Sequence, residues 1–219
     1  MTVRVLFLIA GFGLSLGAVG LGAHAEDASL LVVTIVGQAE VRKSPEADWG
    51  PARLRAAIAP GGAARTSAGR LSLRTAGGQT LRMDRGSAIE FVPADHAARV
   101  RLGEGSVWAA VAPLSPPGAH LSVETGPVVV SVREGGVGIA FASDGSVVIR
   151  VYHGSAECTG TSPDRPWSRA LTDGQELSVS AAAQLGATST FDRSTLEPWA
   201  IWNEDQDLAG GYRRVPAAH

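Results

Sequence analysis

The chain has 219 residues, of which 45% are hydrophobic and 18% are charged, and its formal net charge at pH 7 is −2. This near-neutral balance argues against a dedicated nucleic-acid binder, which carries an excess of Lys and Arg. The length suits one sizeable domain, or one domain with a tail. The single cysteine, Cys158, excludes an intrachain disulfide, so the fold must hold by packing.

Residues 1–25 have the pattern of a secretory signal peptide. Arg4 precedes an apolar run at residues 5–21, and the small-residue triplet Ala23-His24-Ala25 precedes Glu26. We therefore predict export, to the periplasm or outside the cell, with cleavage after Ala25. The alternative is an uncleaved anchor, because a run of this length nearly crosses a bilayer. Membrane contact is expected only in that case.

Two strand signals open the remaining chain, at residues 30–36 and 39–42, where apolar and β-branched residues dominate. Only Gly37 and Gln38 separate the two segments. We predict a bend or a bulge there, within one edge of a sheet.

Residues 70–84 predict a hairpin with one dry and one wet face, because apolar and polar side chains alternate. A two-residue turn would place Leu73 opposite Arg82 and disrupt the apolar face. A three-residue turn at residues 76–78 pairs Leu73 with Leu81, and it requires a glycine in the left-handed conformation. The predicted apolar face consists of Leu71, Leu73, Leu81 and Met83.

Short strand segments continue along the chain, separated by Gly and Pro turns that include Gly135-Gly136. This spacing predicts an all-β fold, an antiparallel β-sandwich or β-roll of many short strands. Residues 128–132 and 147–151 are largely apolar on both parities, which predicts central strands. The further segments are residues 88–92, 99–102, 106–111, 120–124, 128–133, 137–142 and 146–153.

A short internal echo suggests a duplicated element. Gly37-Gln-Ala-Glu-Val41 precedes Trp49, and Gly154-Ser-Ala-Glu-Cys158 precedes Trp167 at a similar spacing. If the echo is real, the two tryptophans pack equivalently at opposite ends of the sheet. The alternative is coincidence. Cys158 itself fits a small buried hydrophobic residue, against the alternatives of a reactive thiol or an intermolecular bridge.

These segments resemble the extracytoplasmic domain of the FecR family, whose members form a glycine-punctuated series of β-strands. The resemblance covers about residues 33–179. The family's Gly-Thr-x-Phe element is degraded, because Glu134-Gly135-Gly136 follows Val132-Arg133. The resemblance therefore implies a fold for residues 26–190 more than an activity. It rests on Ala63-Ala-Arg-Thr66, Leu71-Ser-Leu73, Gly86-Ser87, Ile89-Glu-Phe91, Val100-Arg-Leu102, Gly105-Ser-Val107, Val123-Glu-Thr125 and residues 147–157.

Better-known members of this family act in iron-uptake signalling. A cytoplasmic segment restrains a sigma factor, one helix crosses the membrane, and the outer domain contacts a TonB-dependent receptor. Only four residues precede the apolar run in this sequence, so we expect a stand-alone exported member without the sigma-factor segment. For such a member the resemblance implies an envelope-side interaction module.

Residues 191–219 differ in character and predict a helical or extended tail. A short helix is expected to begin near Pro198, with Ser194 or Thr195 as its cap and Gly210 beyond its end. One interpretation is that this helix packs back onto the sheet. The other is an exposed docking tail of Trp199, Trp202 and Tyr212, rimmed by Glu204, Asp205 and Asp207.

Arginines concentrate between residues 65 and 101, where the local charge is +4, whereas the chain from His153 onward sums to −4. A basic surface of this kind could hold an anionic envelope polysaccharide or a lipid headgroup. The alternatives are a solvated face that protects an edge hairpin from aggregation, or a surface on which the acidic tail packs. The predicted binding arginines are Arg70, Arg74, Arg82, Arg85, Arg99 and Arg101.

No catalytic, cofactor-binding or metal-ligating pattern is recognisable. The histidines show no metal-ligand spacing, so surface or turn positions are expected for His96, His120, His153 and His219. Glu90 with Asp95 leaves a glycosidase pair open. We therefore predict a non-enzymatic periplasmic or envelope binding module that contacts another envelope protein in signalling or assembly, without a cofactor. An anionic glycan is the alternative ligand, and a hydrolase on a β-scaffold is the third hypothesis.

Overall fold

The computed structural model describes residues 29–93, 98–113, 120–162 and 165–212. The predicted signal peptide, residues 1–25, lies outside the described residues. Within the described residues, no helix is both long enough and apolar enough to cross a membrane.

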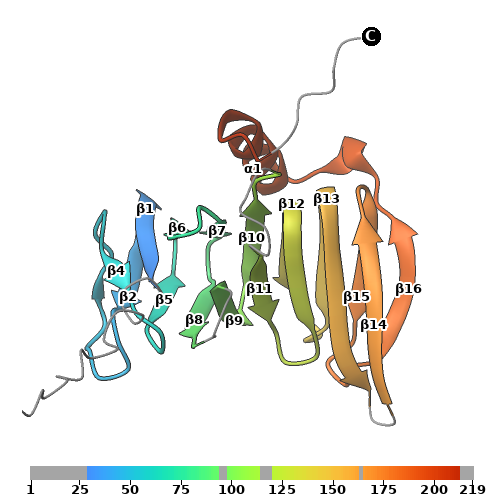
Figure 1. Cartoon of the computed structure of the whole chain (residues 1–219), viewed down its shortest axis with the longest axis horizontal. Helices are drawn as coiled ribbons and strands as arrows, with labels where there is room; N and C mark the ends of the chain where they lie inside the picture. The colour runs from blue at the N-terminus through green and yellow to red at the C-terminus, as the bar shows by residue number, and fades with distance from the viewer. Residues whose placement is uncertain (1–28, 94–97, 114–119, 163–164, 213–219) are drawn as a thin grey trace, which may run out of the picture.

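The described chain is mostly β-structure with one short C-terminal helix, which confirms the predicted fold class. One pair, β9 with β11, is parallel, so the sheet is mixed and not wholly antiparallel. Figure 1 shows the N-terminal strands in blue at one end, β14 to β16 in orange at the other, and α1 in dark red above β10. The strands are β1 (Leu30–Val36), β2 (Ala39–Arg42), β3 (Gly50–Pro51), β4 (Ala57–Ile58), β5 (Ala63–Thr66), β6 (Arg70–Thr75), β7 (Thr80–Met83), β8 (Ala88–Val92), β9 (Ala98–Glu104), β10 (Ser106–Val111), β11 (Leu121–Glu124), β12 (Val129–Phe141), β13 (Val147–Ser162), β14 (Arg165–Thr172), β15 (Gln175–Val179) and β16 (Leu185–Thr190); a 3₁₀ turn η1 (Arg193–Thr195) and helix α1 (Pro198–Ala209) follow.

The sheet curls because its two longest strands belong to both of its halves. The first part of β12 pairs with β11 and its second part pairs with β10. In the same way, the first part of β13 pairs with β15 and its second part pairs with β14. Apolar side chains from both halves meet in a single buried core.

Gly135 and Gly154 lie opposite each other where β12 and β13 pass from one half to the other. Their φ angles are 101° and 83°. A Cβ on Gly135 would lie 2.0 Å from the His153 carbonyl oxygen, and a Cβ on Gly154 would lie 2.3 Å from the Glu134 carbonyl oxygen. The predicted turn at Gly135-Gly136 is therefore wrong. The strand continues through this point, and side-chain-free residues let the two backbones bend together.

The hairpin of β6 and β7 confirms the register predicted from the alternation. Leu73 pairs with Leu81 and Leu71 pairs with Met83. The turn at residues 76–78 contains Gly78 with a φ angle of 85°. All four apolar side chains enter the core.

The break at Gly37 does more than bend one sheet edge, so that prediction is corrected. β1 pairs with β4 and β6, whereas β2 pairs with β3 and β5, which lie in the opposite half of the sheet. Gly37, with a φ angle of 72°, carries the chain between the two halves.

The two tryptophans of the internal echo belong to opposite ends of one half of the sheet, beside β3 and within β14. Their packing is not equivalent. Trp49 is 36% exposed, with the Arg65 guanidinium 4.4 Å from its ring centroid. Trp167 packs against the core above Gly160. The predicted positions agree with the structure, and the predicted equivalence does not.

Cys158 is fully buried in the core, as predicted for a small hydrophobic residue. Burial raises the pKa of its thiol to about 12. We expect iodoacetamide to leave the folded protein unlabelled between pH 7 and pH 9 and to alkylate one thiol rapidly in denaturant, because only the thiolate reacts. Mass spectrometry measures the difference, and rapid labelling of the folded chain would contradict this burial.

Candidate functional site

Helix α1 begins at Pro198 and is followed by Gly210, as predicted. The predicted cap is wrong. Ser194 and Thr195 belong to η1, where Asp192 accepts from the Ser194 N–H. The residue that precedes α1 is Glu197, whose side chain makes no capping hydrogen bond.

Helix α1 lies on the face of the sheet that points away from the core, so the tail packs back onto the sheet. The residues of α1 that become buried are small or polar: Ala200, Asn203 and Asp207. They meet the outward-facing side chains of β7, β10 and β13, whose neighbours on the opposite parity fill the core. The interface is therefore polar at its centre.

Asp207 is fully buried, and three donors from the sheet converge on its carboxylate. Arg82 Nη1 lies 2.6 Å from Oδ1, while Trp108 Nε1 lies 2.8 Å and His153 Nε2 lies 2.9 Å from Oδ2. Arg82 also donates to the Asn203 side-chain oxygen at 3.3 Å. A buried ion pair is tolerated when further hydrogen bonds satisfy both charges, and this arrangement meets that condition.

A second set of contacts, mainly aromatic, flanks this network. Trp108 and Tyr152 have ring centroids 4.4 Å apart, and Phe191 packs on the other side of Tyr152 at 5.0 Å. Burial raises the pKa of Tyr152 above its ordinary value. Tyr212 is buried at the far end, where its hydroxyl bonds Thr80 Oγ1 at 2.6 Å and the Gly78 carbonyl oxygen at 2.9 Å.

The outer side of α1 carries two large apolar side chains. Ile201 and Leu208 are each 49% exposed. They lie seven positions apart, so they share one flank of the helix. Helix α1 contains no Lys or Arg, and Asp205 is exposed beside them. The helix therefore presents an apolar and acidic surface.

A groove of about 230 Å³ lies between the start of α1 and the sheet. Trp108, Gly138 and Tyr152 contribute to its lining from the strands, and Glu197 and Trp199 contribute from α1. A Cβ on Gly138 would lie 3.0 Å from Tyr152 Cε2, so the absence of a side chain there leaves room above the strands.

The structure does not gather the predicted arginines into one basic surface. Arg82 is buried under α1 and pairs with Asp207, so its expected exposure is wrong: the face that alternation predicted to be wet is covered by the helix. Arg70 pairs with Asp84 at 2.7 Å, and its guanidinium lies 4.8 Å from the Trp199 ring centroid.

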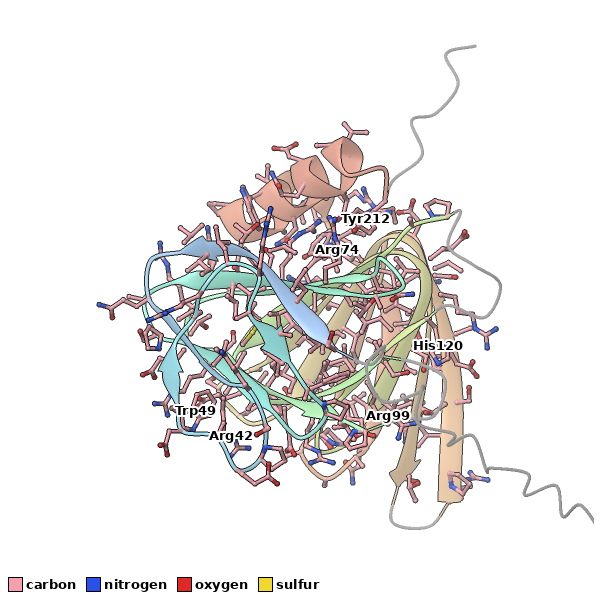
Figure 2. The ribbon with its side chains drawn as sticks, turned by 60° about the vertical axis from the view of Figure 1, so that its left-hand side comes forward. Arg42, Trp49, Arg74, Arg99, His120 and Tyr212 are labelled. Atoms are coloured by element: carbon pink, nitrogen blue, oxygen red, sulfur yellow. The ribbon has the colours of Figure 1, made fainter. Side chains whose placement is uncertain are left out.

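The other four arginines are exposed but divided. Arg99 and Arg101 lie on β9 and pair with Glu124, Arg101 also with Glu90. Arg74 and Arg85 lie at the ends of the β6–β7 hairpin, and among the described residues neither makes an ion pair. Figure 2 shows Arg74 beside Tyr212 near α1, and Arg99 at the opposite side of the molecule.

The three aromatic residues of the predicted docking tail also separate. Trp199 and Trp202 are half-buried and stack on each other at 5.3 Å. Tyr212 is buried against the β6–β7 turn and is not available at the surface. The exposed apolar side chains of α1 are Ile201 and Leu208, which the sequence interpretation did not single out.

Of the histidines and acids considered for a metal site or a glycosidase pair, His120, His153 and Glu90 lie within the described residues. His153 is buried against Asp207, so its predicted surface position is wrong, whereas His120 is half-buried. Glu90 is bridged to Arg101. His96, His219 and Asp95 lie outside the described residues. No three His, Cys, Asp or Glu side chains are grouped to hold a metal ion in the part of the chain that the structure describes.

Comparison with known proteins gives a family match and a fold match. Residues 63–157 match the family model described as FecR protein. Two crystal structures, each of a "putative anti-sigma factor" from Parabacteroides distasonis ATCC 8503, superpose with a TM-score of 0.51. One is 16% identical and covers 68% of this chain and 72% of its own; the other is 15% identical and covers 71% and 78%. No curated protein sequence matches the chain significantly.

Proposed function

Because residues 63–157 form a FecR domain, we propose that the protein is an exported, non-enzymatic module that binds another envelope protein in signalling or assembly. The fold similarity to two structures of a "putative anti-sigma factor" supports a signalling context. The predicted signal peptide supports a periplasmic or secreted location. Contact with a membrane is proposed only if that segment remains uncleaved.

The observation that carries the proposal is the exposed surface of α1. A helix that packs on a sheet normally buries its apolar stripe, but α1 buries Asn203 and Asp207 and leaves Ile201 and Leu208 half exposed. The buried ion pair fixes the helix in place, so these apolar side chains form a preorganised surface. Apolar side chains beside the exposed carboxylate of Asp205 fit a partner with an apolar groove and a basic group at its edge.

The ends of the sheet are less suited to binding. β3 and β4 are two residues long, β14 carries Pro166, and the pairing of β16 with β15 is interrupted by a register shift. Short strands, proline and bulges are the devices that stop another chain from pairing with a sheet edge. We therefore place the partner on the α1 surface and not on a strand edge.

Affinity capture from native envelope extract tests the proposal, with Ile201→Glu plus Leu208→Glu as the probe variant. We expect the double variant to lose a protein that the wild-type chain captures, by at least about tenfold, because two apolar contacts become charged. The matched control is Leu54→Glu, which changes a 63% exposed leucine on the β3–β4 connection. Equal capture by all three chains would refute this surface.

The alternative ligand is an anionic envelope polymer or lipid headgroup, and Arg74 and Arg85 are the two predicted arginines without an ion pair among the described residues. Two separated guanidinium groups make a weak site, so this function ranks second. We expect Arg74→Glu plus Arg85→Glu to change the free energy of unfolding by less than about 0.5 kcal/mol and to leave protein capture unchanged. Loss of retention on an anionic polysaccharide column would favour the alternative.

A further inference from the structure

The donors that hold Asp207 all belong to the FecR domain, and the carboxylate does not. Arg82, Trp108 and His153 lie within residues 63–157, whereas Asp207 lies on α1, beyond the matched segment. Together these three side chains form a binding site for one carboxylate. The positively charged guanidinium contacts one carboxylate oxygen, and two ring N–H groups donate to the other. Charge-assisted hydrogen bonds of this kind are strong and directional.

The polar centre of the interface between α1 and the sheet favours dissociation of the helix. The fully buried residues of α1 are Ala200, Asn203 and Asp207, and apolar contacts surround them, made by Trp199 on the helix and by residues that flank it. At the polar centre, water hydrates the released charges when the helix separates, so this part of the interface costs less to expose than an apolar surface of equal size. A helix of 12 residues is also marginal alone, so release of α1 is coupled to its unfolding.

We propose that Arg82, Trp108 and His153 form a carboxylate-binding site for an acidic helix of another protein, and that Asp207 of α1 is its resident occupant. The spacing of the resident residues defines the ligand: a small residue, an amide three positions later and a carboxylate four positions after that. This inference rests on the proposed function and adds its regulation. A helix bound in trans displaces α1 and dismantles the Ile201–Leu208 surface, so the two binding events exclude each other.

A helix of another protein must compete with α1, which is tethered to the same chain as the site. A short tether gives α1 an effective concentration of about millimolar at its own site. A free helix therefore binds the wild-type chain much more weakly than it binds a chain whose α1 is loosened. Linkage requires the reciprocal effect, so a partner on the α1 surface lowers the affinity of the site for a helix in trans by the same factor.

A labelled synthetic peptide of residues 191–212 tests the site by fluorescence anisotropy against the full-length chain. We expect it to bind the Asp207→Asn chain at least about tenfold more tightly than the wild-type chain. A matched peptide that carries Asp207→Asn should bind the same variant chain at least about tenfold more weakly, because it lacks the charged acceptor. Equal binding of the two peptides, or binding of neither to a folded variant chain, would overturn the proposal.

A second experiment retains Asp207 and its three donors, and it applies if the Asp207→Asn chain does not fold. A protease site is placed in the full-length chain at Ser194 and Thr195, which are exposed, and is cut after folding. The native segment should remain bound and exchange with excess labelled peptide, and the Asp207→Asn peptide should not replace it. A cut segment that never exchanges, or that both peptides replace equally, would refute the site.

These outcomes are separate from those of the capture experiment. The peptide tests depend on Arg82, Trp108 and His153 and need no cellular partner. Loss of the captured protein in the Ile201→Glu plus Leu208→Glu chain would stand even if the peptides fail. Successful peptide exchange would equally stand if no protein is captured.

Discussion

Replacing Asp207 by alanine is expected to lower the free energy of unfolding by about 3 to 5 kcal/mol, because it leaves a buried guanidinium without its counter-charge. Arg82 is almost fully buried, and Asp207 is its charged partner. The substitution also removes the acceptor for the Trp108 and His153 ring N–H groups. Urea denaturation followed by tryptophan fluorescence measures the change.

Asp205→Ala is the matched control, since Asp205 lies on the same helix and is exposed. Its effect should stay within about 0.5 kcal/mol. The Arg82→Ala plus Asp207→Ala chain should be less destabilised than the sum of the two single variants, because it removes both charges together. Additive effects, or equal losses for Asp205→Ala and Asp207→Ala, would show that the carboxylate does not hold the helix.

Local alternation was sufficient to predict the β6–β7 hairpin. The parity of Leu71, Leu73, Leu81 and Met83 and the glycines of the turn leave one register that keeps the apolar face intact, and the structure has that register. Alternation identifies two faces, however, and it does not say what covers the polar one. The burial of Arg82 depends on a helix 125 positions away in sequence, which no local pattern contains.

Two signals in the sequence did point toward the network. The basic charge of residues 65–101 and the acidic charge of the chain after His153 suggested that the tail packs on the arginines, and the Arg82–Asp207 pair agrees with that interpretation. Ala200, Asn203 and Asp207 also share one helix face, whereas the apolar residues of α1 fall on more than one side. His153 had no such signal, because the charge sums count histidine as neutral.

The long strands β12 and β13 were the main error in the element predictions. Paired glycines ordinarily mark turns, so the sequence Gly135-Gly136 predicts a chain reversal. In the structure Gly135 pairs with Gly154 of the neighbouring strand, and both strands continue past this point. A contact between two backbones from different strands cannot be read from either segment alone.

Gly135→Ala is expected to destabilise the fold by about 3 to 5 kcal/mol, through backbone strain and through a clash that cannot be relieved by a side-chain movement. The φ angle of Gly135 is 101°, and a Cβ there would lie 2.0 Å from the His153 carbonyl oxygen. Relief requires the two strands to separate at the corner that joins both halves of the sheet. Thermal unfolding monitored by circular dichroism measures the loss.

Gly174→Ala separates the two contributions. Gly174 has a φ angle of 77°, but nothing lies within 4 Å of the position that a Cβ would take. This variant should lose only about 1 to 2 kcal/mol, the cost of the backbone conformation alone. If Gly135→Ala were no more harmful than Gly174→Ala, the corner could open without loss of packing. The folded sheet would then not depend on the close approach of β12 and β13.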